Sequence, residues 1–368
     1  MLRICHFVPV FQTASGVSAF AGEVANVQAA KGNAVVIATL PRYLQEHYPV
    51  ASSVRVVDTM MGLEWREAPP DIVHIHGIWT PVLHRVVTCA TEAGVPIVWS
   101  PHGMLAPWAM RHKGWKKWPV WWLWQRRDLA KAAIIHATTE LEAGWVRGLG
   151  LRNELSVVPL GTSLPERKND FQNKEKIVLF VGRIYPVKGL VNLINAWAIL
   201  FGEAKTKPVS GEFDSWKLRI VGPDEAGHKA ELERLIEAKG LRGKVELAGA
   251  KFGNGLDWEY DRCECLVLPS FTENFGATVP EALAHGKPCI ASTFTPWREL
   301  EEMGCGWWVS NEPAELAKAI GEMMAAGEDA RREMGERGRR LVEEKYSWSG
   351  VAAQMLKEYE SLPRVVVE

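Results

Sequence analysis

Two glutamates with a fixed spacing are the first candidates for chemistry. Glu273 lies in a polar loop after a short apolar run, and Glu281 comes eight positions later, directly after Pro280. Proline is tolerated in the first turn of a helix, where its missing N–H would have no partner. We therefore expect a strand, a loop and a helix that begins at Pro280, with Glu281 in its first turn. Open α/β sheets bind ligands at such strand-to-helix junctions.

The two carboxylates are compatible with more than one function. A glycoside hydrolase uses two such groups about 5 to 10 Å apart across a sugar. Glu281 at a helix start would also suit the vicinal hydroxyls of a ribose, and Glu273 in an exposed loop would suit a sugar. Glu281 could equally be a carboxylate that only stabilises the helix dipole. The pair alone does not separate hydrolysis from sugar binding.

A second group of candidate residues is basic. Arg183 and Lys188 stand between Gly182 and Gly189, after an apolar run over 177–181 and before a helical pattern. Arginine binds phosphate oxygens through two parallel N–H groups, lysine adds a point charge, and a helix N-terminus favours an anion. Either residue alone could be a solvated loop charge. Together at one junction they predict a diphosphate site.

Histidines lie at the ends of two predicted strands. His102 follows Ser100 and Pro101 in a Ser-Pro-His-Gly-Met run. A hydrogen bond or partial positive charge from His102 would help a sugar centre and a leaving phosphate to separate. We expect His74 and His76, in the next strand upstream, to face opposite sides of the sheet. One of them then belongs to the core, and His76 is the better candidate for the site.

Short β-branched runs alternate with helix-length segments along the chain, which predicts parallel strands with helical crossovers. The polar stretch 161–176 interrupts this rhythm, which then restarts. The length of 368 residues also favours two domains. The expected strands are 4–8, 34–39, 54–57, 72–75, 96–100, 134–137, 177–181, 218–221, 245–248, 266–268, 288–291 and 307–309, and the main expected helices are 17–31, 189–200, 229–238, 314–326, 330–345 and 349–360.

The composition excludes several classes of protein. A net charge of −1 gives no reason to expect a nucleic-acid partner, although residues 1–165 carry 15 basic and 11 acidic side chains and could meet an anion. The six cysteines lie mostly in apolar runs without C-x-x-C spacing, so we expect reduced core residues in a cytosolic protein. No apolar span approaches the ~18 residues that cross a bilayer.

The segment Trp108–Arg127 is unusually rich in tryptophan and basic residues. Six of the 17 tryptophans fall in it, interleaved with lysine and arginine. Tryptophan settles at membrane interfaces and basic groups attract anionic headgroups, so the segment predicts a peripheral membrane contact. In the alternative interpretation Trp121, Trp122 and Trp124 pack on the sheet while the charges face water.

Taken together, these motifs resemble retaining glycosyltransferase family 4. Glu273 and Glu281 have its E-x7-E spacing, the 182–189 segment is similar to its G-R-x(n)-K-G element, and 284–288 is similar to the A-x-G-x-P that follows. The Pro-His-Gly-Met run resembles members that act in surface-polysaccharide assembly. The resemblance covers the whole chain. It implies an α/β, GT-B fold: two Rossmann-like, doubly wound domains facing each other across a cleft.

The resemblance also implies roles for individual residues. Arg183 and Lys188 would hold the diphosphate of a nucleotide-sugar, and Glu281 its ribose. The sequence departs from the family where Asn274 stands in place of a common glycine, and where only Gly16 remains of a double-glycine loop. Gly16 would let an acceptor or phosphate approach, or is a plain turn glycine. The remaining implied contacts are His102 and Glu273 as catalytic residues, Asn274, Phe275 and Gly276 at the donor sugar, and His76 with Gly16 near the acceptor or phosphate.

The implied domains are 1–165 for the acceptor, 170–346 for the donor, and a helix at 347–362 that packs back on the first domain. No metal or other cofactor is expected, because Arg183, Lys188 and helix termini can meet the diphosphate charge. The transfer would proceed by front-face substitution, in which the leaving phosphate helps to deprotonate the acceptor. We expect a cytoplasmic enzyme, peripheral on the inner membrane face, with a glycan or lipid-linked glycan as acceptor.

Other functions share this architecture. A nucleotide-sugar epimerase would use the same donor site, and a glycogen-type phosphorylase would need a pyridoxal-phosphate lysine, for which the sequence offers no clear position. A non-catalytic nucleotide-sugar-binding protein would not need all four of Arg183, Lys188, Glu273 and Glu281. Product analysis separates transfer from these alternatives.

Overall fold

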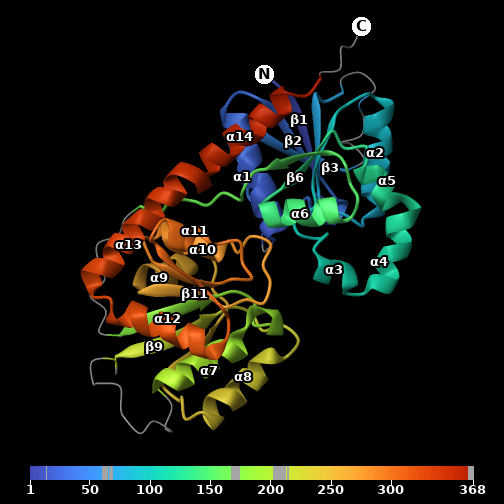
Figure 1. The fold of residues 1–368 in the computed structure, drawn as a ribbon. Helices are drawn as coiled ribbons and strands as arrows, with labels where there is room; N and C mark the ends of the chain where they lie inside the picture. Colours follow the sequence, from blue (N-terminus) through green and yellow to red (C-terminus); the bar gives the residue numbers. More distant parts are fainter. Residues whose placement is uncertain are drawn as a thin grey trace. The chain divides into compact units, whose positions relative to one another are not determined.

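The chain forms two compact units in a computed structural model that describes residues 1–13, 15–59, 65, 69–166, 175–201, 213 and 215–363. Unit 1 comprises Met1–Gly161 and Trp348–Glu368, and unit 2 comprises Thr162–Ser347. Figure 1 shows the course of the chain through them. Part of the predicted link at 161–176 lies outside the described residues.

Unit 1 is built on a parallel sheet of seven strands in the order β3-β2-β1-β4-β5-β6-β7 among the described residues. The order reverses between β1 and β4, which pair in register from Ile4 opposite Ile72 to Phe7 opposite Ile75. Such a reversal is the switch point where ligands bind in open sheets. The strands are β1 (Arg3–Phe7), β2 (Ala34–Thr39), β3 (Val54–Asp58), β4 (Ile72–His76), β5 (Ile97–Ser100), β6 (Ile134–Ala137) and β7 (Glu154–Val157).

Helices cover both faces of this sheet (Figure 1). They are α1 (Gly16–Ala30), the 3₁₀ turn η1 (Pro41–Tyr43), α2 (Pro81–Glu92), α3 (Pro107–Arg111), α4 (Gly114–Val120), the π segment η3 (Trp121–Gln125), α5 (Arg126–Leu129), α6 (Glu140–Gly148) and α14 (Trp348–Glu360). The last of these, α14, lies beside α1, although more than 300 residues separate them in the sequence.

The side chains of β1 alternate between two apolar cores, one on each face of the sheet. Ile4 packs with Phe20 of α1 and Met355 of α14, whereas Cys5 and Phe7 pack in the other core. The period of two follows from strand geometry. At the carboxyl end of the sheet, the core that contains Ile4 ends in polar residues. These residues are buried and lie in phase with the apolar residues of that core: His6, His74, His76, Ser100 and His136.

Within its described residues, unit 2 repeats the architecture with six parallel strands in the order β10-β9-β8-β11-β12-β13. The strands are β8 (Lys176–Val181), β9 (Trp216–Val221), β10 (Val245–Gly249), β11 (Cys265–Leu268), β12 (Cys289–Ser292) and β13 (Gly306–Val309). The helical elements are η4 (Pro186–Lys188), α7 (Leu190–Phe201), α8 (His228–Ala238), α9 (Asn254–Arg262), α10 (Thr278–Ala284), α11 (Glu299–Glu302), α12 (Pro313–Ala325), α13 (Glu328–Leu341) and the π segment η6 (Val342–Tyr346). The order reverses between β8 and β11, so unit 2 has its own switch point.

Two Rossmann-like parallel sheets therefore confirm the predicted fold class. The differences from the predicted elements are local. Strand β7 was not predicted, and the expected helix at 330–345 ends in the π turns of η6. The helix expected to begin at Pro280 begins two residues earlier, at Thr278, because proline is tolerated throughout a first turn where N–H groups have no partner. Glu281 is still in that first turn.

The docking of α14 gives a testable prediction about stability. Met355→Ala removes a side chain that is 1% exposed and leaves a cavity against the α1 face, so unit 1 should lose about 2 to 5 kcal/mol of unfolding free energy. Chemical denaturation measures this loss. The adjacent Gln354 is exposed, and Gln354→Ala should change the same quantity by less than about 0.5 kcal/mol. Equal effects of the two substitutions would contradict a docked α14.

Candidate active site

In unit 2, the loop after β8 is held against the loop after β11 by their backbones. Gly189 ends the 3₁₀ turn η4 with a φ of 70° and leads into α7. A Cβ on Gly189 would lie 2.1 Å from the carbonyl oxygen of Pro269, so only glycine allows this approach. The contact brings the basic residue before Gly189 next to the acidic loop.

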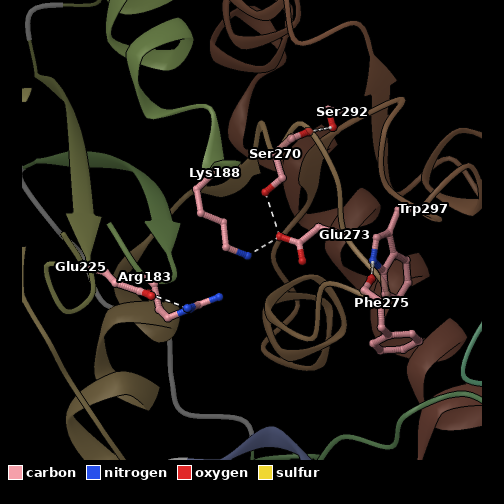
Figure 2. A network of polar contacts seen from close by, with 8 residues as sticks. All are labelled: Arg183, Lys188, Glu225, Ser270, Glu273, Phe275, Ser292 and Trp297. Carbon is pink, nitrogen blue, oxygen red and sulfur yellow. Dashed lines mark hydrogen bonds and ion pairs between the residues drawn. The ribbon is translucent and has the colours of Figure 1, made fainter. Parts of the chain in front are cut away.

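Lys188 and Glu273 form an ion pair at this junction (Figure 2). Their side chains are only 16% and 13% exposed, so the pair is largely shielded from water. The Ser270 hydroxyl donates to the same Oε1 of Glu273 over 2.8 Å, and Ser292 Oγ donates to the Ser270 carbonyl over 2.5 Å. Two donors thus fix the carboxylate of Glu273 in one orientation.

Arg183 has a different partner from the one Lys188 has. Its guanidinium pairs with Glu225 over 2.5 Å, and the two side chains are 57% and 43% exposed. Exposed pairs of this kind contribute at most about 1 kcal/mol. Arg183 can therefore leave Glu225 for an arriving anion at small cost. Sequence reasoning did not single out Glu225, because nothing in its spacing marks it.

Glu281 is anchored to Tyr260, which sequence reasoning also missed. The Tyr260 hydroxyl donates to Oε2 of Glu281 over 2.5 Å. Burial raises the pKa of Glu281 to about 7, and nearby Asp257 adds to the rise, while the Tyr260 hydrogen bond lowers it. At neutral pH the group therefore exists in both protonation states. Tyr260 is two residues before the end of α9, and no sequence signal connects it to α10.

The side chains of the other candidate residues in the loop after β11 have mainly structural roles. Phe275 is 5% exposed and packs edge-on against Trp297, whose indole N–H donates to the Phe275 carbonyl over 2.5 Å. Gly276 has a φ of 79°, and a Cβ there would lie 2.9 Å from Leu268. The loop that contains Asn274 is therefore rigid at Phe275 and Gly276. The buried Phe275 side chain is therefore part of the loop's packing and is not exposed to a ligand.

In unit 1, His74 and His76 do not face opposite sides of the sheet. Their ring centroids lie 4.1 Å apart and both side chains are buried. The expectation was wrong because residues two apart in a strand share a face. His76 bonds through Nδ1 to Nε2 of His102 over 3.0 Å, and through Nε2 to Nδ1 of His6 over 3.0 Å.

His102 is held in an uncommon backbone conformation. Its φ is 53°, in the left-handed region, and the next N–H, of Gly103, donates to the buried carboxylate of Glu142 over 2.5 Å. Burial lowers the pKa of His102 to about 3, with a smaller contribution from His136. The ring is therefore neutral near pH 7. Of its two suggested modes of action, a hydrogen bond fits this state and a positive charge does not.

Gly16 is the first residue of α1, behind Ser15, whose hydroxyl caps the helix by accepting from Ser18 N–H. Apart from its two chain neighbours and the backbone of its own helix, no described atom lies within 4 Å of where a Cβ on Gly16 would stand. The space leaves room for a ligand near this backbone. The structure does not require glycine there for packing.

The tryptophan-rich segment forms α3, α4, η3 and α5. Trp121 is 2% exposed and packs in the core, as the alternative interpretation expected for it. Trp115, Trp122 and Leu123 are 75%, 61% and 64% exposed. Trp122 therefore does not pack on the sheet. Within the described residues, no helix has both the length and the apolar character required to cross a bilayer.

Two family models match most of the chain. The model described as "Glycosyl transferase 4-like domain" matches residues 15–161, and the model described as "Glycosyl transferases group 1" matches residues 165–341. The chain belongs to glycosyltransferase family 4, with the GT-B fold. The family 4 resemblance seen in the sequence is thereby confirmed.

Curated relatives match this chain over different shares of its length. An uncharacterized glycosyltransferase of Methanocaldococcus jannaschii is 30% identical over 190 residues, which are 51% of this chain and 45% of that protein. A GDP-mannose:cellobiosyl-diphosphopolyprenol alpha-mannosyltransferase of Xanthomonas oryzae pv. oryzae is 26% identical over 323 residues, 86% of this chain and 80% of that protein. The chain spans less than half the length of the first curated relatives that it matches.

The fold is also similar to solved structures. HepE of Anabaena, crystallised in complex with UDP and glucose, superposes with a TM-score of 0.74 at 17% identity, covering 98% of this chain and all of that one. At this identity the similarity supports the GT-B fold alone.

The ionisation of Glu281 gives a prediction for this site. Tyr260→Phe removes the hydrogen bond that lowers the pKa of Glu281, so this pKa should rise above about 7 and the carboxyl should stay protonated to higher pH. The carboxyl band in isotope-edited infrared spectra, followed against pH, measures the change. Tyr185→Phe, in another loop of unit 2, should leave the titration unchanged. An unshifted midpoint in Tyr260→Phe would mean that the hydrogen bond does not exist in solution.

Proposed function

We propose that this glycosyltransferase moves a hexose or deoxyhexose from a nucleoside-diphosphate sugar to a glycan acceptor, with retention of configuration at the transferred carbon. The observation that carries the proposal is the Lys188–Glu273 pair at the switch point of unit 2. A lysine and a carboxylate in one shielded place can meet the two halves of such a donor. The lysine meets the phosphates, and the carboxylate meets the sugar hydroxyls.

The order of contacts follows from charge. A diphosphate carries more negative charge than Glu273 and competes with it for Lys188, and it can also draw Arg183 from its exposed partner. Glu273 then has its Oε atoms available to accept from sugar hydroxyls, while Ser270 keeps the carboxylate in place. Glu281 in its ionised form accepts from the ribose hydroxyls.

In the proposed reaction no metal ion or other cofactor takes part. Arg183, Lys188 and the start of α7 supply the positive charge that the leaving diphosphate requires. The acceptor attacks from the face that the diphosphate leaves, and a phosphate oxygen takes the proton of the acceptor hydroxyl. We assign His102 of unit 1 to a hydrogen bond with the reacting sugar.

We further propose a lipid-linked acceptor in surface-polysaccharide biosynthesis on the cytoplasmic side of the membrane. The name of the Xanthomonas relative, which describes transfer to a cellobiosyl-diphosphopolyprenol, supports this class of acceptor. The exposed rings of unit 1 support a membrane contact. Lys116 lies over the ring of Trp115 at 4.8 Å and Arg126 over that of Trp122 at 5.5 Å, so basic groups accompany the exposed aromatic surface.

A panel of nucleotide-sugars, incubated with and without acceptor, tests the reaction. Nucleoside diphosphate released only with acceptor supports transfer. A changed sugar that still bears its nucleotide would indicate an epimerase instead, and binding without any reaction would indicate a non-catalytic protein. Analysis of the anomeric configuration in the product tests retention.

Two substitutions should separate binding from chemistry. Lys188→Ala removes a charged contact to the diphosphate and should weaken nucleoside-diphosphate binding about 10- to 100-fold by calorimetry. Glu273→Ala should abolish transfer with nucleotide affinity equal or higher, because Lys188 loses its competing partner. Lys239→Ala, at an exposed position of unit 2, is the charge-matched control. Near-normal turnover in Glu273→Ala would disprove the assigned role of that residue.

The membrane contact has its own test. Trp115→Ala combined with Trp122→Ala should abolish co-sedimentation with anionic liposomes at low salt, because the exposed rings supply the interfacial contact. Phe252→Ala removes a ring that is 70% exposed in unit 2 and should leave binding unchanged. Wild-type protein that fails to bind anionic liposomes at low salt would rule the contact out.

A further inference from the structure

A row of hydrogen-bonded imidazoles runs from α1 to the loop after β5 inside unit 1. Gln28 Oε1 lies 2.8 Å from His6 Nε2, His6 Nδ1 lies 3.0 Å from His76 Nε2, and His76 Nδ1 lies 3.0 Å from His102 Nε2. Gln28, His6 and His76 are at most 1% exposed. Neither the proposed reaction nor the core packing accounts for so many polar rings in line.

The amide at the inner end sets the direction of every bond in the row. A neutral imidazole has one N–H donor and one acceptor nitrogen, and an amide oxygen can only accept. His6 must therefore donate from Nε2 to Gln28, which leaves its Nδ1 to accept from His76 Nε2–H. In the same way His76 Nδ1 accepts from His102 Nε2–H. The last nitrogen, Nδ1 of His102, is left with a lone pair.

The open nitrogen of His102 has no hydrogen-bond partner among the described residues. The row stays neutral because burial lowers the pKa of His6 to about 4 and also lowers the pKa values of His76 and His102. The buried carboxylate of Glu142 accepts from Gly103 N–H and from Thr138. A ligand that reaches His102 therefore meets the lone pair on its Nδ1.

In a second row beside the first, the donors and acceptors can be assigned in the same way. His136 Nε2 donates to the Val158 carbonyl over 2.7 Å, so its Nδ1 accepts from Ser100 Oγ over 2.6 Å. Ser100 in turn accepts from His74 Nε2 over 2.6 Å, and Tyr359 of α14 donates to His74 Nδ1 over 2.5 Å. Both nitrogens of His74 are therefore occupied, so His74 cannot hydrogen-bond to a ring of the first row and change the direction of its bonds.

The same rings could be considered as metal ligands. His6, His74 and His76 each offer a nitrogen within 4.8 Å of the others. Hydrogen bonds already engage both nitrogens of all three rings, however, and a divalent ion would have to replace several of these bonds. Among the described residues, no carboxylate joins the three rings to balance the ion's charge. The hydrogen-bonded row is the better account.

We propose that Gln28, His6 and His76 are positioning residues that hold His102 in its Nε2–H tautomer and present Nδ1 as a hydrogen-bond acceptor. The group that His102 meets in the substrate must then donate a hydrogen, as a sugar hydroxyl does, because a deprotonated phosphate oxygen has none to donate. The effect of this tautomer on catalysis rests on the proposed function. The tautomer itself does not depend on that function.

A matched pair of substitutions at one position tests the row. In His76→Gln the amide oxygen can accept from His102 and the amide nitrogen can donate to His6, so the direction of the row is kept. In His76→Leu both bonds are lost and His102 is free to change tautomer. Gln28→Met, which removes the terminal amide and leaves all the rings in place, is a third variant should His76→Leu fail to fold.

The first readout is the ¹⁵N NMR spectrum of the histidine rings, which distinguishes protonated from unprotonated ring nitrogens. In wild type and His76→Gln, His102 should be protonated at Nε2 alone, whereas His76→Leu or Gln28→Met should shift or mix the two tautomers. A proton on Nδ1 of wild-type His102, as a reversed Gln28 amide would give, overturns the proposal. Stoichiometric zinc in the purified protein would overturn it as well.

The second readout is steady-state transfer kinetics. His76→Leu should lower kcat roughly tenfold, the effect of one misdirected hydrogen bond, with KM for the nucleotide-sugar nearly unchanged, and His76→Gln should restore most of the rate. Equal rates in all variants would overturn the catalytic consequence. If no nucleotide-sugar reacts with wild type, the proposed function fails, and the NMR measurement still decides whether the row orients His102.

Discussion

The close approach of two backbones at Gly189 is the constraint on which the site of unit 2 depends. No side chain fits between this residue and the Pro269 carbonyl, so the loops after β8 and β11 can meet only with glycine there. Their meeting turns two residues far apart in sequence into a shielded ion pair. Without it, Lys188 and Glu273 would be ordinary loop charges, screened by water and free to choose other partners.

Burial then decides the ionisation of the groups around both switch points. Glu281 is buried beside a tyrosine hydroxyl and titrates near neutrality, whereas His102 is buried among other imidazoles and stays neutral. A carboxylate and a histidine are usually assigned roles from their pKa values in water. In this chain the surroundings change both values, so the surroundings have to be known before a role is assigned.

Much of this could be read from the sequence. The alternation of strands and helices predicted both sheets, and the joint spacing of Arg183, Lys188, Glu273 and Glu281 predicted which loops lie at the switch point of unit 2. These patterns are local, and a parallel sheet brings the ends of its strands to one edge. Patterns of this kind are therefore sufficient to predict the fold and the loops that form the candidate site.

Other features could not be read from the sequence, because they depend on contacts between distant segments. Tyr260 reaches Glu281 from another helix, and Glu225 reaches Arg183 from another loop. The imidazole row is an intermediate case. Its members His6 and His76 are in phase with the apolar residues of their strands, so a consistent use of the two-residue period would have placed them on one face.

The position of α14 has a consequence for biosynthesis. Unit 2 is continuous in sequence, but unit 1 is completed by a helix that follows unit 2, and Tyr359 of that helix bonds to His74 in the buried cluster. On the ribosome, unit 2 can fold while unit 1 still exposes the apolar face of α1. The histidine cluster closes only after residue 359 has emerged, so a nascent or truncated chain would lack a finished unit 1 even with unit 2 fully formed.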